Sequence, residues 1–423
     1  MDEKNGKHEN NLYFCKMVIA RSQKKFAISM GLSYKQILVA SAILMIYVSA
    51  IVYSFEAVCG EGDHNVSEQG ELEGLRAGVD AIDAKILELL NERAELAIKI
   101  AETKIKHKMD FYAPDREFKI YERLTKINKG PFPSEAIRPV FREIISASLS
   151  LEQPIKIAYL GPKATFTHLA CIHHFGLSAD FIQKRNVPEI FDEVERDGVN
   201  FGVVPIENST EGVVSNTLDM FVDSNLKICA EILLEISHHL MSKTGNIEDI
   251  EKVYSHPHAI AQCRNWLENN LPNIPVLDVA STAVAAQNAA DDPSVAAIAS
   301  EFAATLYDLR IVKRKVEDNI NNFTRFLVIG KKEPEKRGND KTSIMFSVKD
   351  EVGALHRMLE PFARNDINLT KIESRPLKKK AWEYIFFLDM EGHVSDENVK
   401  NALEELRKNS LFLKILGSYP RAR

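Results

Sequence analysis

A long amphipathic helix is the first element that the hydrophobic pattern predicts. From residue 75 onward, apolar residues recur at intervals of three and four, which is the spacing of one face of a helix. The apolar positions are Leu75, Val79, Ile82, Ile86, Leu89, Leu96 and Ile100. No proline interrupts the pattern before Pro114, so a single helix of about 35 residues would run roughly 50 Å. That length and that apolar face predict packing in a bundle or in a dimer.

Two cations interrupt the apolar face of this helix. Arg93 and Lys104 lie 11 residues apart and therefore return to almost the same side. In one interpretation, Lys104 extends its ammonium into water at a fraying helix end and Arg93 marks the edge of the face. In the other, two cations on an apolar seam form a buried anion site. Arg116, in a second helix that starts at Pro114, adds a further cation, and a third helix follows over residues 134–152.

The pattern changes at Pro154, where short β-branched runs begin to alternate with helical stretches. The runs are IKIAYLG, VNFGVVPIENS, KVYSHP, PVLDVAST, VAAIAS and FTRFLVIG. This alternation predicts an α/β module with mostly parallel sheet.

Three of these strands lead into hydroxyl-rich loops that are followed at once by helices. The loops carry Thr165, then Glu207, Asn208, Ser209 and Thr210, and then Ser281 and Thr282. Strand ends and helix N-termini favour anions, and in open α/β folds they converge on the ligand crevice. Each hydroxyl could instead be only a helix cap. The recurrence, together with the sequence NNFTR at 321–325, predicts a cleft that binds carboxylates.

A smaller α+β module follows the polar linker EKRGND at 335–340. Its predicted order is strand, helix, strand, strand, helix, strand, which is the ferredoxin-like topology. The elements are expected at 342–348, 353–365, 367–374, 382–390, 397–408 and 411–416.

Composition and charge narrow the function classes. Hydrophobic residues make up 45% of the 423 and charged residues 27%, as in ordinary globular proteins. A net charge of −6, with no basic stripe interleaved with aromatics, gives no reason to expect nucleic acid. Five scattered cysteines are typical of reduced thiols in a cytoplasmic protein. No pair of histidines has the spacing of a structural zinc site, so we expect no metal and no other cofactor.

An uncharged, largely apolar segment at 37–55 does not fit that picture. Its 19 residues could span a membrane, and the basic residues before it would then place the rest of the chain outside the cytoplasm. A cleavable signal is a poor match. Alternatively, residues 1–65 are not translated, because GEGD at 60–63 is encoded by purine-rich codons like a ribosome-binding site and Val66 could be a start codon.

The helical module resembles a known enzyme family. LRAGVDAIDAKILELLNERAELAIKIAETK, FYAPDRE and IISASLSLE are similar to the all-helical chorismate mutases, in which an intertwined dimer converts chorismate to prephenate. The resemblance implies that Arg93 and Arg116 bind substrate carboxylates, that Lys104 stabilises the charge developing on the breaking ether oxygen, and that Arg76 serves the partner's site. Glu117, Ser148 and Glu152 match positions that hydrogen-bond the substrate. Some members carry Asp where this chain has Ala113.

Glu152 occupies a position that is Gln in some members of that family and Glu in others. As Glu it must be protonated to donate a hydrogen bond, a state that burial favours. We therefore expect mutase activity to fall as pH rises and the fall to be flattened by Glu152→Gln.

The α/β module resembles prephenate dehydratases. The matching motifs are YLGPKATFTHLA, GVVPIENSTEGVV, SHPHAIAQCRNWL, STAVAA and NNFTRFLVIG, in that order. That family has two subdomains like those of periplasmic binding proteins, with the site between them. The resemblance implies that Thr324 donates a proton to the departing hydroxyl of prephenate and that Arg325 binds a carboxylate. Asn321, Asn322 and Phe326 would shape the pocket.

The C-terminal module resembles the phenylalanine-binding ACT domain. The motifs are GALHRML, which begins at Gly353, and ESRP at 373–376. The resemblance implies an effector site formed by Gly353, Ala354, Leu355, Glu373, Ser374, Arg375 and Pro376. Val352 stands where Pro often precedes that Gly.

These resemblances together predict a bifunctional, phenylalanine-regulated enzyme of at least dimeric state that makes phenylpyruvate from chorismate. The expected divisions are an extension at 1–67, a mutase at 68–153, a dehydratase at 154–332 and an ACT domain at 340–423. Two alternatives remain at this point: a dehydratase that prefers arogenate, and a membrane-anchored amino-acid sensor without catalysis.

Overall fold

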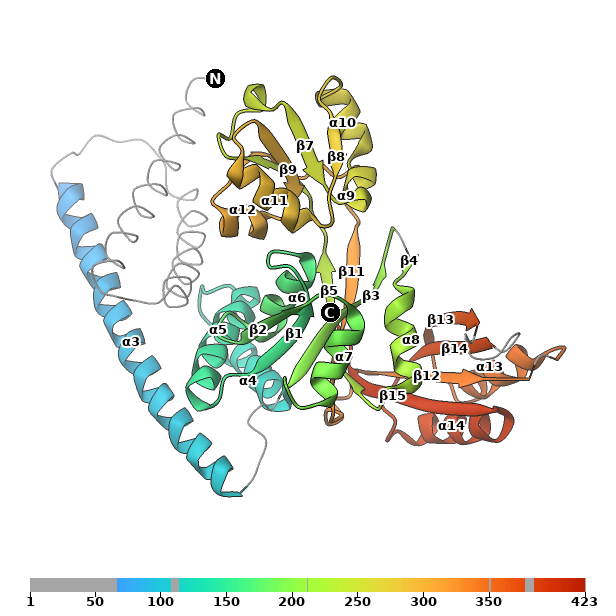
Figure 1. Ribbon diagram of the computed structural model, residues 1–423. Coiled ribbons are helices and arrows are strands. Elements are labelled where there is room, and N and C mark those ends of the chain that lie inside the picture. Colours follow the sequence, from blue (N-terminus) through green and yellow to red (C-terminus); the bar gives the residue numbers. More distant parts are fainter. Residues whose placement is uncertain (1–66, 108–113, 211, 350, 377–383, 423) are drawn as a thin grey trace. The chain divides into compact units, whose positions relative to one another are not determined.

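A computed structural model describes residues 67–107, 114–210, 212–349, 351–376 and 384–422. The apolar segment at 37–55 and Val66 lie outside these residues. No helix in the described ranges is long and apolar enough to cross a membrane. The chain divides into two compact units, one helical and one built around three sheets (Figure 1).

The helical unit contains the long helix that the sequence predicts. Helix α3 (Ser67–His107) packs against α5 (Ser134–Glu152), and the later part of α4 (Pro114–Ile127) completes the unit. Ala97 and Ala101 are buried on α3. The apolar face predicted from the sequence is not: its seven members, Leu75, Val79, Ile82, Ile86, Leu89, Leu96 and Ile100, are between 41% and 65% exposed. A single chain therefore leaves this seam uncovered.

The first lobe of the α/β region is a sheet in the order β2-β1-β3-β11-β5, with β4 on β3. Its β1, β2 and β3 are parallel, whereas β11 runs antiparallel between β3 and β5. The elements are β1 (Lys156–Leu160), α6 (Phe166–Phe175), β2 (Asp180–Lys184), α7 (Val187–Glu195), β3 (Phe201–Asn208), β4 (Gly212–Val213), α8 (Ser215–Asp223), β5 (Lys227–Glu235) and β11 (Phe323–Gly330). The chain thus returns to the first lobe after building the second.

The second lobe is a sheet in the order β10-β6-β9-β7-β8 with apolar clusters of small and branched residues against it. Its elements are β6 (His239–Ser242), β7 (Lys252–Ser255), α9 (Pro257–Gln262), α10 (Arg264–Asn270), β8 (Val276–Asp278), α11 (Thr282–Asp291), β9 (Val295–Ala299), α12 (Glu301–Tyr307) and β10 (Arg310–Lys313), with a short 3-10 turn at Ile247–Asp249. The two-lobed α/β fold expected from the sequence is confirmed. The expectation of mostly parallel sheet is wrong, because β11 and β6 each run antiparallel to both of their neighbours.

The C-terminal region has the predicted ferredoxin-like order, with the sheet β13-β14-β12-β15. Its elements are β12 (Asp340–Ser347), α13 (Ala354–Arg364), β13 (Leu369–Pro376), β14 (Tyr384–Glu391), α14 (Glu397–Asn409) and β15 (Phe412–Pro420). Side chains of both helices pack with one face of the sheet in a cluster that includes Phe346, Phe362 and Leu406.

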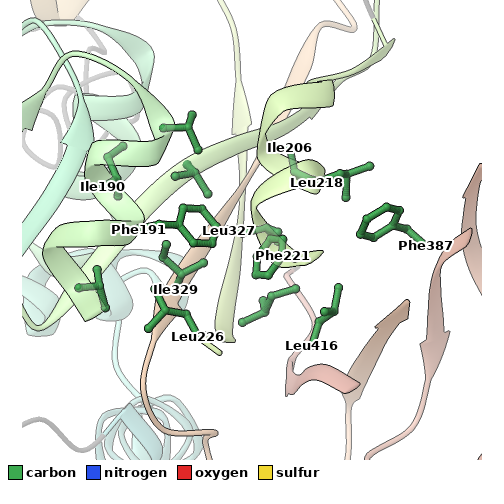
Figure 2. Packing of buried hydrophobic residues seen from close by; sticks show 14 of the residues in the cluster. Ile190, Phe191, Ile206, Leu218, Phe221, Leu226, Leu327, Ile329, Phe387 and Leu416 are labelled. Carbon is green, nitrogen blue, oxygen red and sulfur yellow. The ribbon is translucent and has the colours of Figure 1, made fainter. Parts of the chain in front are cut away.

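The other face of this sheet shares a core with the first lobe. Phe387 and Leu416 of the C-terminal sheet belong to the same buried cluster as Phe191 and Phe221 (Figure 2). Strand β15 passes so close to β5 that a Cβ on Gly417 would lie 2.3 Å from the carbonyl oxygen of Ile228. The C-terminal region is therefore docked on the first lobe through a continuous core.

Candidate active sites

In the helical unit, α5 brings polar groups to both cations of α3. The guanidinium of Arg93 donates to Ser148 Oγ, and Lys104 Nζ lies 3.3 Å from Glu152 Oε2. Burial lowers the pKa of Arg93, against the opposing effect of the nearby Glu152 and Tyr121. Four residues proposed from sequence thus meet where α3 contacts α5. They form a small site with fixed positive charge, suited to a dicarboxylate that develops negative charge on an oxygen.

The other predicted mutase residues lie elsewhere on the helices. Arg76 is exposed, 17 residues before Arg93 on the same helix, which corresponds to about 26 Å along its axis. Arg116 is exposed and Glu117 half-buried in the first turn of α4. Because of that axial separation, Arg76 cannot serve the pocket that contains Arg93 of its own chain.

In the α/β region, the ends of β3 and β11 form the polar centre of the first lobe. Thr324 is paired with Asn208 across the two strands. Asn208 Nδ2 donates both to Thr324 Oγ1, at 2.8 Å, and to Asn322 Oδ1, at 2.9 Å. Thr324 is half-buried, whereas Asn322 is only 1% exposed. The strand end that carries NNFT therefore presents one hydroxyl held by an amide network.

The hydroxyl loops predicted as a carboxylate cleft also serve local structure. Thr165 Oγ1 donates to the carbonyls of Leu160 and Pro162 and accepts from the N–H of His168, so that it caps α6. Ser281 caps α11 by accepting from the N–H of Val284. Thr282 is buried in the first turn of the same helix. The capping alternative is thus realised at Thr165 and Ser281.

The loop after β3 is fixed to β11 by reciprocal hydrogen bonds. Ser209 Oγ accepts from the N–H of Phe323 at 2.9 Å, and the N–H of Ser209 donates to the carbonyl of Phe323 at 2.9 Å. The exposed Thr210 turns back on Asn208, donating from its N–H to Asn208 Oδ1 at 2.9 Å. These bonds hold the loop in register with the strand that carries Thr324.

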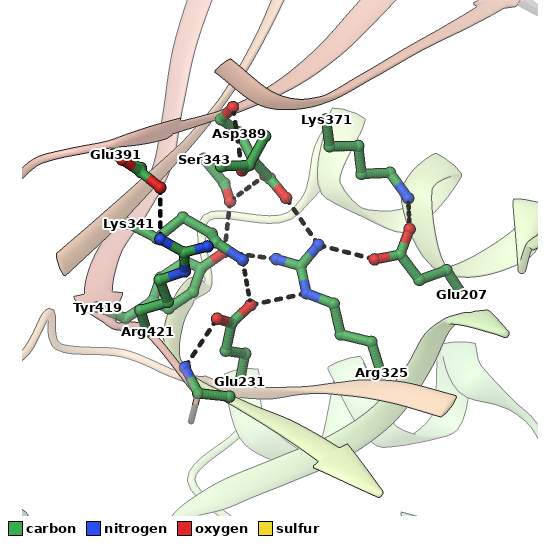
Figure 3. A network of polar contacts seen from close by, with 12 residues as sticks. Glu207, Glu231, Arg325, Lys341, Ser343, Lys371, Asp389, Glu391, Tyr419 and Arg421 are labelled. Carbon is green, nitrogen blue, oxygen red and sulfur yellow. Dashed lines mark hydrogen bonds and ion pairs between the residues drawn. The ribbon is translucent and has the colours of Figure 1, made fainter. Parts of the chain in front are cut away.

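Arg325 does not lie where the sequence interpretation placed it. Its side chain is 7% exposed and forms ion pairs with Glu207 at 3.1 Å, Glu231 at 2.7 Å and Asp389 at 2.7 Å (Figure 3). It also donates to the hydroxyl of Tyr419 at 2.9 Å. Because successive side chains of a strand point to opposite faces, Arg325 faces away from Thr324 and toward the C-terminal sheet. The expected contact with a substrate carboxylate is replaced by this buried network.

Glu207 belongs to the same network, although the sequence analysis assigned it to substrate. It contacts both Arg325 and Lys371 of β13. Burial acts to raise the pKa of Glu207, but the hydrogen bonds and charges of Lys371 and Arg325 outweigh it and hold the pKa below its ordinary value. Burial alone would lower the pKa of Arg325, and the neighbouring Tyr419, Asp389, Glu231 and Glu207 raise it instead. Both groups are therefore charged partners between the first lobe and the C-terminal sheet.

Phe326, expected to shape the pocket, is 1% exposed within β11, next to a register shift between Arg325 and Phe326. Such irregularities re-aim side chains and are frequent beside active sites. Here the shift coincides with the point where the strand changes from polar to apolar side chains.

The sequence analysis did not single out Gln262, at the end of α9 in the second lobe. Its Oε1 accepts from Asn322 Nδ2 at 2.8 Å, and its Nε2 donates to Thr210 Oγ1 at 3.2 Å. One amide thus connects the second lobe to both polar segments of the first. The only signal in the sequence was its place in the motif SHPHAIAQCRNWL.

The predicted effector residues fall at two places of the C-terminal sheet and its helix. Gly353 caps α13 with φ at +76°, a conformation that favours glycine. Ala354 and Leu355 follow at the start of α13. Glu373, Ser374, Arg375 and Pro376 end β13. Arg375 Nε lies 3.4 Å from Asp219 Oδ1 of α8, so the end of β13 contacts the first lobe directly.

Comparison with known families matches all three regions in order. The model for chorismate mutase type II matches residues 75–153, that for prephenate dehydratase residues 157–334, and that for the ACT domain residues 342–408. A crystal structure of prephenate dehydratase from Arthrobacter aurescens in complex with L-Phe has a TM-score of 0.59 and 35% identity, covering 63% of this chain and 90% of that chain.

Relatives that align over most of this chain include two bacterial proteins. A protein of Aquifex aeolicus named bifunctional chorismate mutase/prephenate dehydratase is 53% identical over 356 residues, covering 83% of this chain and 98% of that protein. One of the same name from Pseudomonas aeruginosa is 43% identical over 363 residues, covering 84% of this chain and 100% of that protein. This chain therefore belongs to the family of bifunctional chorismate mutase/prephenate dehydratases, which convert chorismate to prephenate and prephenate to phenylpyruvate, with an ACT domain for phenylalanine regulation.

Proposed function

We propose that the mutase reaction takes place between α3 and α5. Arg93 binds a carboxylate of chorismate, and Lys104 donates to the ether oxygen as the C–O bond breaks. The rearrangement is unimolecular, so preorganised charge and a compact substrate conformer are what the protein must supply. Arg116, Glu117 and Ser148 add polar contacts, and Glu152 donates in its protonated form. The observation that supports this assignment most strongly is the pairing of Lys104 with Glu152 at 3.3 Å.

The occupant of the exposed seam on α3 is a second copy of the chain. Packing the seam against its counterpart would remove its seven apolar side chains from water, which is favourable in proportion to the area buried. It would also bring Arg76 of one chain toward the site of the other. The enzyme is therefore at least a dimer, with each mutase site completed by the partner.

In the dehydratase, Thr324 is the proton donor. The electron pair of the bond to the departing carboxylate moves into the ring, and the ring hydroxyl leaves as water after taking a proton from Thr324 Oγ1. Aromatisation drives this loss of CO2 and water. The donor from Asn208 at 2.8 Å stabilises the charge that develops on Thr324 Oγ1.

Carboxylate anchoring falls to polar groups in the loops of the two lobes. Thr165, Ser209, Thr210, Ser281 and Thr282 come from the ends of strands or the starts of helices, where N–H groups favour anions. Asn322 and Phe326 shape the pocket beside Thr324. Glu207 and Arg325 act from the opposite face of the strands, through their network.

Two variants of the full chain test this division of labour. Thr324→Ala should strongly slow phenylpyruvate formation so that prephenate accumulates from chorismate, and Lys104→Met should strongly slow chorismate loss while added prephenate is still converted. Loss of both activities in either variant would contradict the assignment of two separate sites.

Phenylalanine binds the ACT domain at two segments, Gly353–Leu355 and Glu373–Pro376. Arg375 links the second segment to Asp219 of α8, the helix that follows the substrate loop. An effector that prefers one arrangement of this contact can change dehydratase activity, because it shifts the equilibrium by its differential affinity. Isothermal titration calorimetry of the Asp219→Asn variant should show that phenylalanine still binds. An activity assay of the same variant should show that phenylalanine no longer lowers its dehydratase activity.

The compartment proposed is the cytoplasm. Cys171, Cys229 and Cys263 are all free thiols in the described structure. Burial raises the pKa of Cys171 and, with the charge of Glu333 nearby, raises that of Cys229 to about 12, so neither is a reactive thiolate. Enzyme activity found in the membrane pellet of a fractionated cell lysate would contradict the proposal, and activity found in the supernatant would support it.

A further inference from the structure

One buried histidine next to the dehydratase site has no role in the function described so far. His238 is 2% exposed, between β5 and β6. Its N–H donates to Glu317 Oε2 at 2.8 Å, and its carbonyl accepts from the N–H of Val316 at 2.8 Å. These two bonds fix the backbone of His238, and the Nε2 atom of its ring lies 2.9 Å from Gln262 Oε1.

A backbone hydrogen bond identifies the orientation of the amides in this region. The N–H of Thr210 lies 2.9 Å from one terminal atom of the Asn208 side chain. A backbone N–H can only donate, so that atom must be Oδ1 and the other must be Nδ2. Asn208 therefore directs its amino group toward Asn322 and Thr324.

That orientation propagates through the neighbouring amides. Because Asn322 Oδ1 accepts from Asn208, its Nδ2 must donate, and the acceptor at 2.8 Å is Gln262 Oε1. Gln262 Nε2 then donates to Thr210 Oγ1, which donates in turn to Asn208 Oδ1. The four side chains form a closed ring of hydrogen bonds with one direction.

The same logic determines which nitrogen of His238 carries the hydrogen. Gln262 Oε1 is an acceptor, so His238 Nε2 must donate to it. His238 Nδ1 is buried and has no hydrogen-bond partner among the described residues. A hydrogen placed there would be buried without an acceptor, which is costly. Burial lowers the pKa of His238, although Gln262 and Glu317 oppose the shift, and this favours the neutral ring.

The direction of this closed ring of hydrogen bonds matters for Thr324. Since Thr324 Oγ1 accepts from Asn208 Nδ2, its own hydrogen points to a different acceptor. A reversed Asn208 would present Oδ1 to Thr324 and take that hydrogen. The ring thus keeps the Thr324 proton available to substrate.

We propose that His238 is a positioning residue of the dehydratase: the hydrogen on its Nε2 holds the amide of Gln262, and through the ring of Gln262, Asn322 and Asn208 it keeps the hydroxyl of Thr324 oriented as a donor. This inference rests on the proposed role of Thr324. It also gives the second lobe a part in the reaction, because Gln262 of α9 joins His238 to Asn322 and Thr210 of the first lobe.

The test compares two replacements of His238 in the full chain. His238→Met fills similar space without a donor, and His238→Gln places an amide nitrogen near the position of Nε2. We expect kcat of the dehydratase to fall about tenfold or more in the Met variant, the effect of losing one buried hydrogen bond, with KM for prephenate little changed. The Gln variant should recover most of that loss. Mutase activity in the same sample checks folding and concentration.

His239→Met is the matched control. His239 is adjacent and also buried, but its Nδ1 accepts from the N–H of Lys315 at 3.1 Å, outside the ring. Equal losses in the Met and Gln variants of His238 would indicate packing alone and overturn the inference, as would an unchanged kcat in His238→Met.

Two further measurements separate this inference from the role of Thr324. In a Thr324→Ala background, His238→Met should have no additional effect on the residual rate. If Thr324→Ala itself is fully active, Thr324 is not the proton donor, and the proposed function fails together with this inference. Nitrogen-15 spectra of histidine-labelled enzyme, assigned by difference with His238→Gln, should show a neutral ring protonated at Nε2. A ring protonated at Nδ1 would overturn the inference independently of activity.

Discussion

Helix α3 and strand β11 carry the two proposed catalytic centres, and one chain completes them to different degrees. Along α3, Arg93 and Lys104 are engaged by α5 while the apolar seam beside them is exposed. Along β11, the half-buried Thr324 accepts a hydrogen bond from Asn208 of the same chain on one face, and Arg325 is buried on the other. In the proposed function, the mutase therefore depends on a partner chain for its substrate cavity, whereas the dehydratase assembles its polar centre within a single chain.

The difference follows from the kind of element that carries each centre. A long amphipathic helix exposes its apolar face unless another helix covers it, so its stability and its site depend together on association. A central strand has neighbours on both sides and side chains on both faces. Every position of β11 can therefore be defined inside one chain.

The largest effect is expected at the hydroxyl of β11. Thr324→Ala should lower dehydratase kcat by about 10²–10⁴-fold, the usual contribution of a positioned proton donor, and leave the mutase unchanged. Steady-state rates with added prephenate measure the change. Thr324→Ser, which keeps the hydroxyl, should retain much of the activity, and an Ala variant as active as Ser would exclude Thr324 as the donor.

The opposite face of the same strand should dominate stability. Arg325→Met leaves the buried Glu231 and Asp389 and the half-buried Glu207 without their shared cation, which should destabilise the dehydratase–ACT unit by about 3–5 kcal/mol. Urea unfolding followed by circular dichroism measures the shift. Lys331→Met, at the exposed pair with Asp197, is the control and should leave the midpoint unchanged. Equal midpoints for both variants would show that the network contributes nothing.

On α3, removing a cation should lower mutase activity. Lys104→Met should raise the mutase barrier by about 3–4 kcal/mol, or roughly 10²–10³-fold in kcat, with prephenate dehydration unaffected. Chorismate disappearance is the measurement. Lys106→Met, two residues further and exposed on another side of α3, should behave like the unaltered enzyme. Equal losses at both positions would point to helix stability in place of charge stabilisation.

The smallest effect is on the pH profile of the mutase. Lys104 pairs with Glu152 in this structure, and Glu152 can donate a hydrogen bond to the substrate only in its acid form. Rising pH removes the acid form, so the mutase rate should fall as pH rises, and Glu152→Gln should flatten the profile. A profile with the same slope in both proteins would show that Glu152 does not donate.

Much of the fold and one face of the dehydratase site could be predicted from sequence. The spacing of apolar residues on α3 identified the helix, and the interruptions at Arg93 and Lys104 identified the cations that α5 engages. The motif NNFTR located the strand end. Local patterns of this kind carry such information because they depend on residues close in sequence.

The partners of Arg325 could not be predicted in the same way. The residue sits beside Thr324 in the motif, and a cation there suits a carboxylate ligand. Its side chain lies on the other face of the strand, and its partner Asp389 comes from a different domain. The shared core of the first lobe and the ACT sheet, hidden by the polar linker at 335–340, was missed for the same reason. Long-range contacts leave no local pattern.

Subunit complementation tests the difference between the two centres most directly. Arg76→Ala and Lys104→Met chains, each inactive as a mutase, are mixed, unfolded and refolded together. If Arg76 serves the partner's site, half of the dimers are mixed and carry one intact site of two, so about a quarter of the mutase activity should return. The matching dehydratase pair, Asn208→Ala with Thr324→Ala, should recover nothing, because both residues act in one chain. Mutase activity no higher than the mean of the two separate variants would contradict a site shared between subunits.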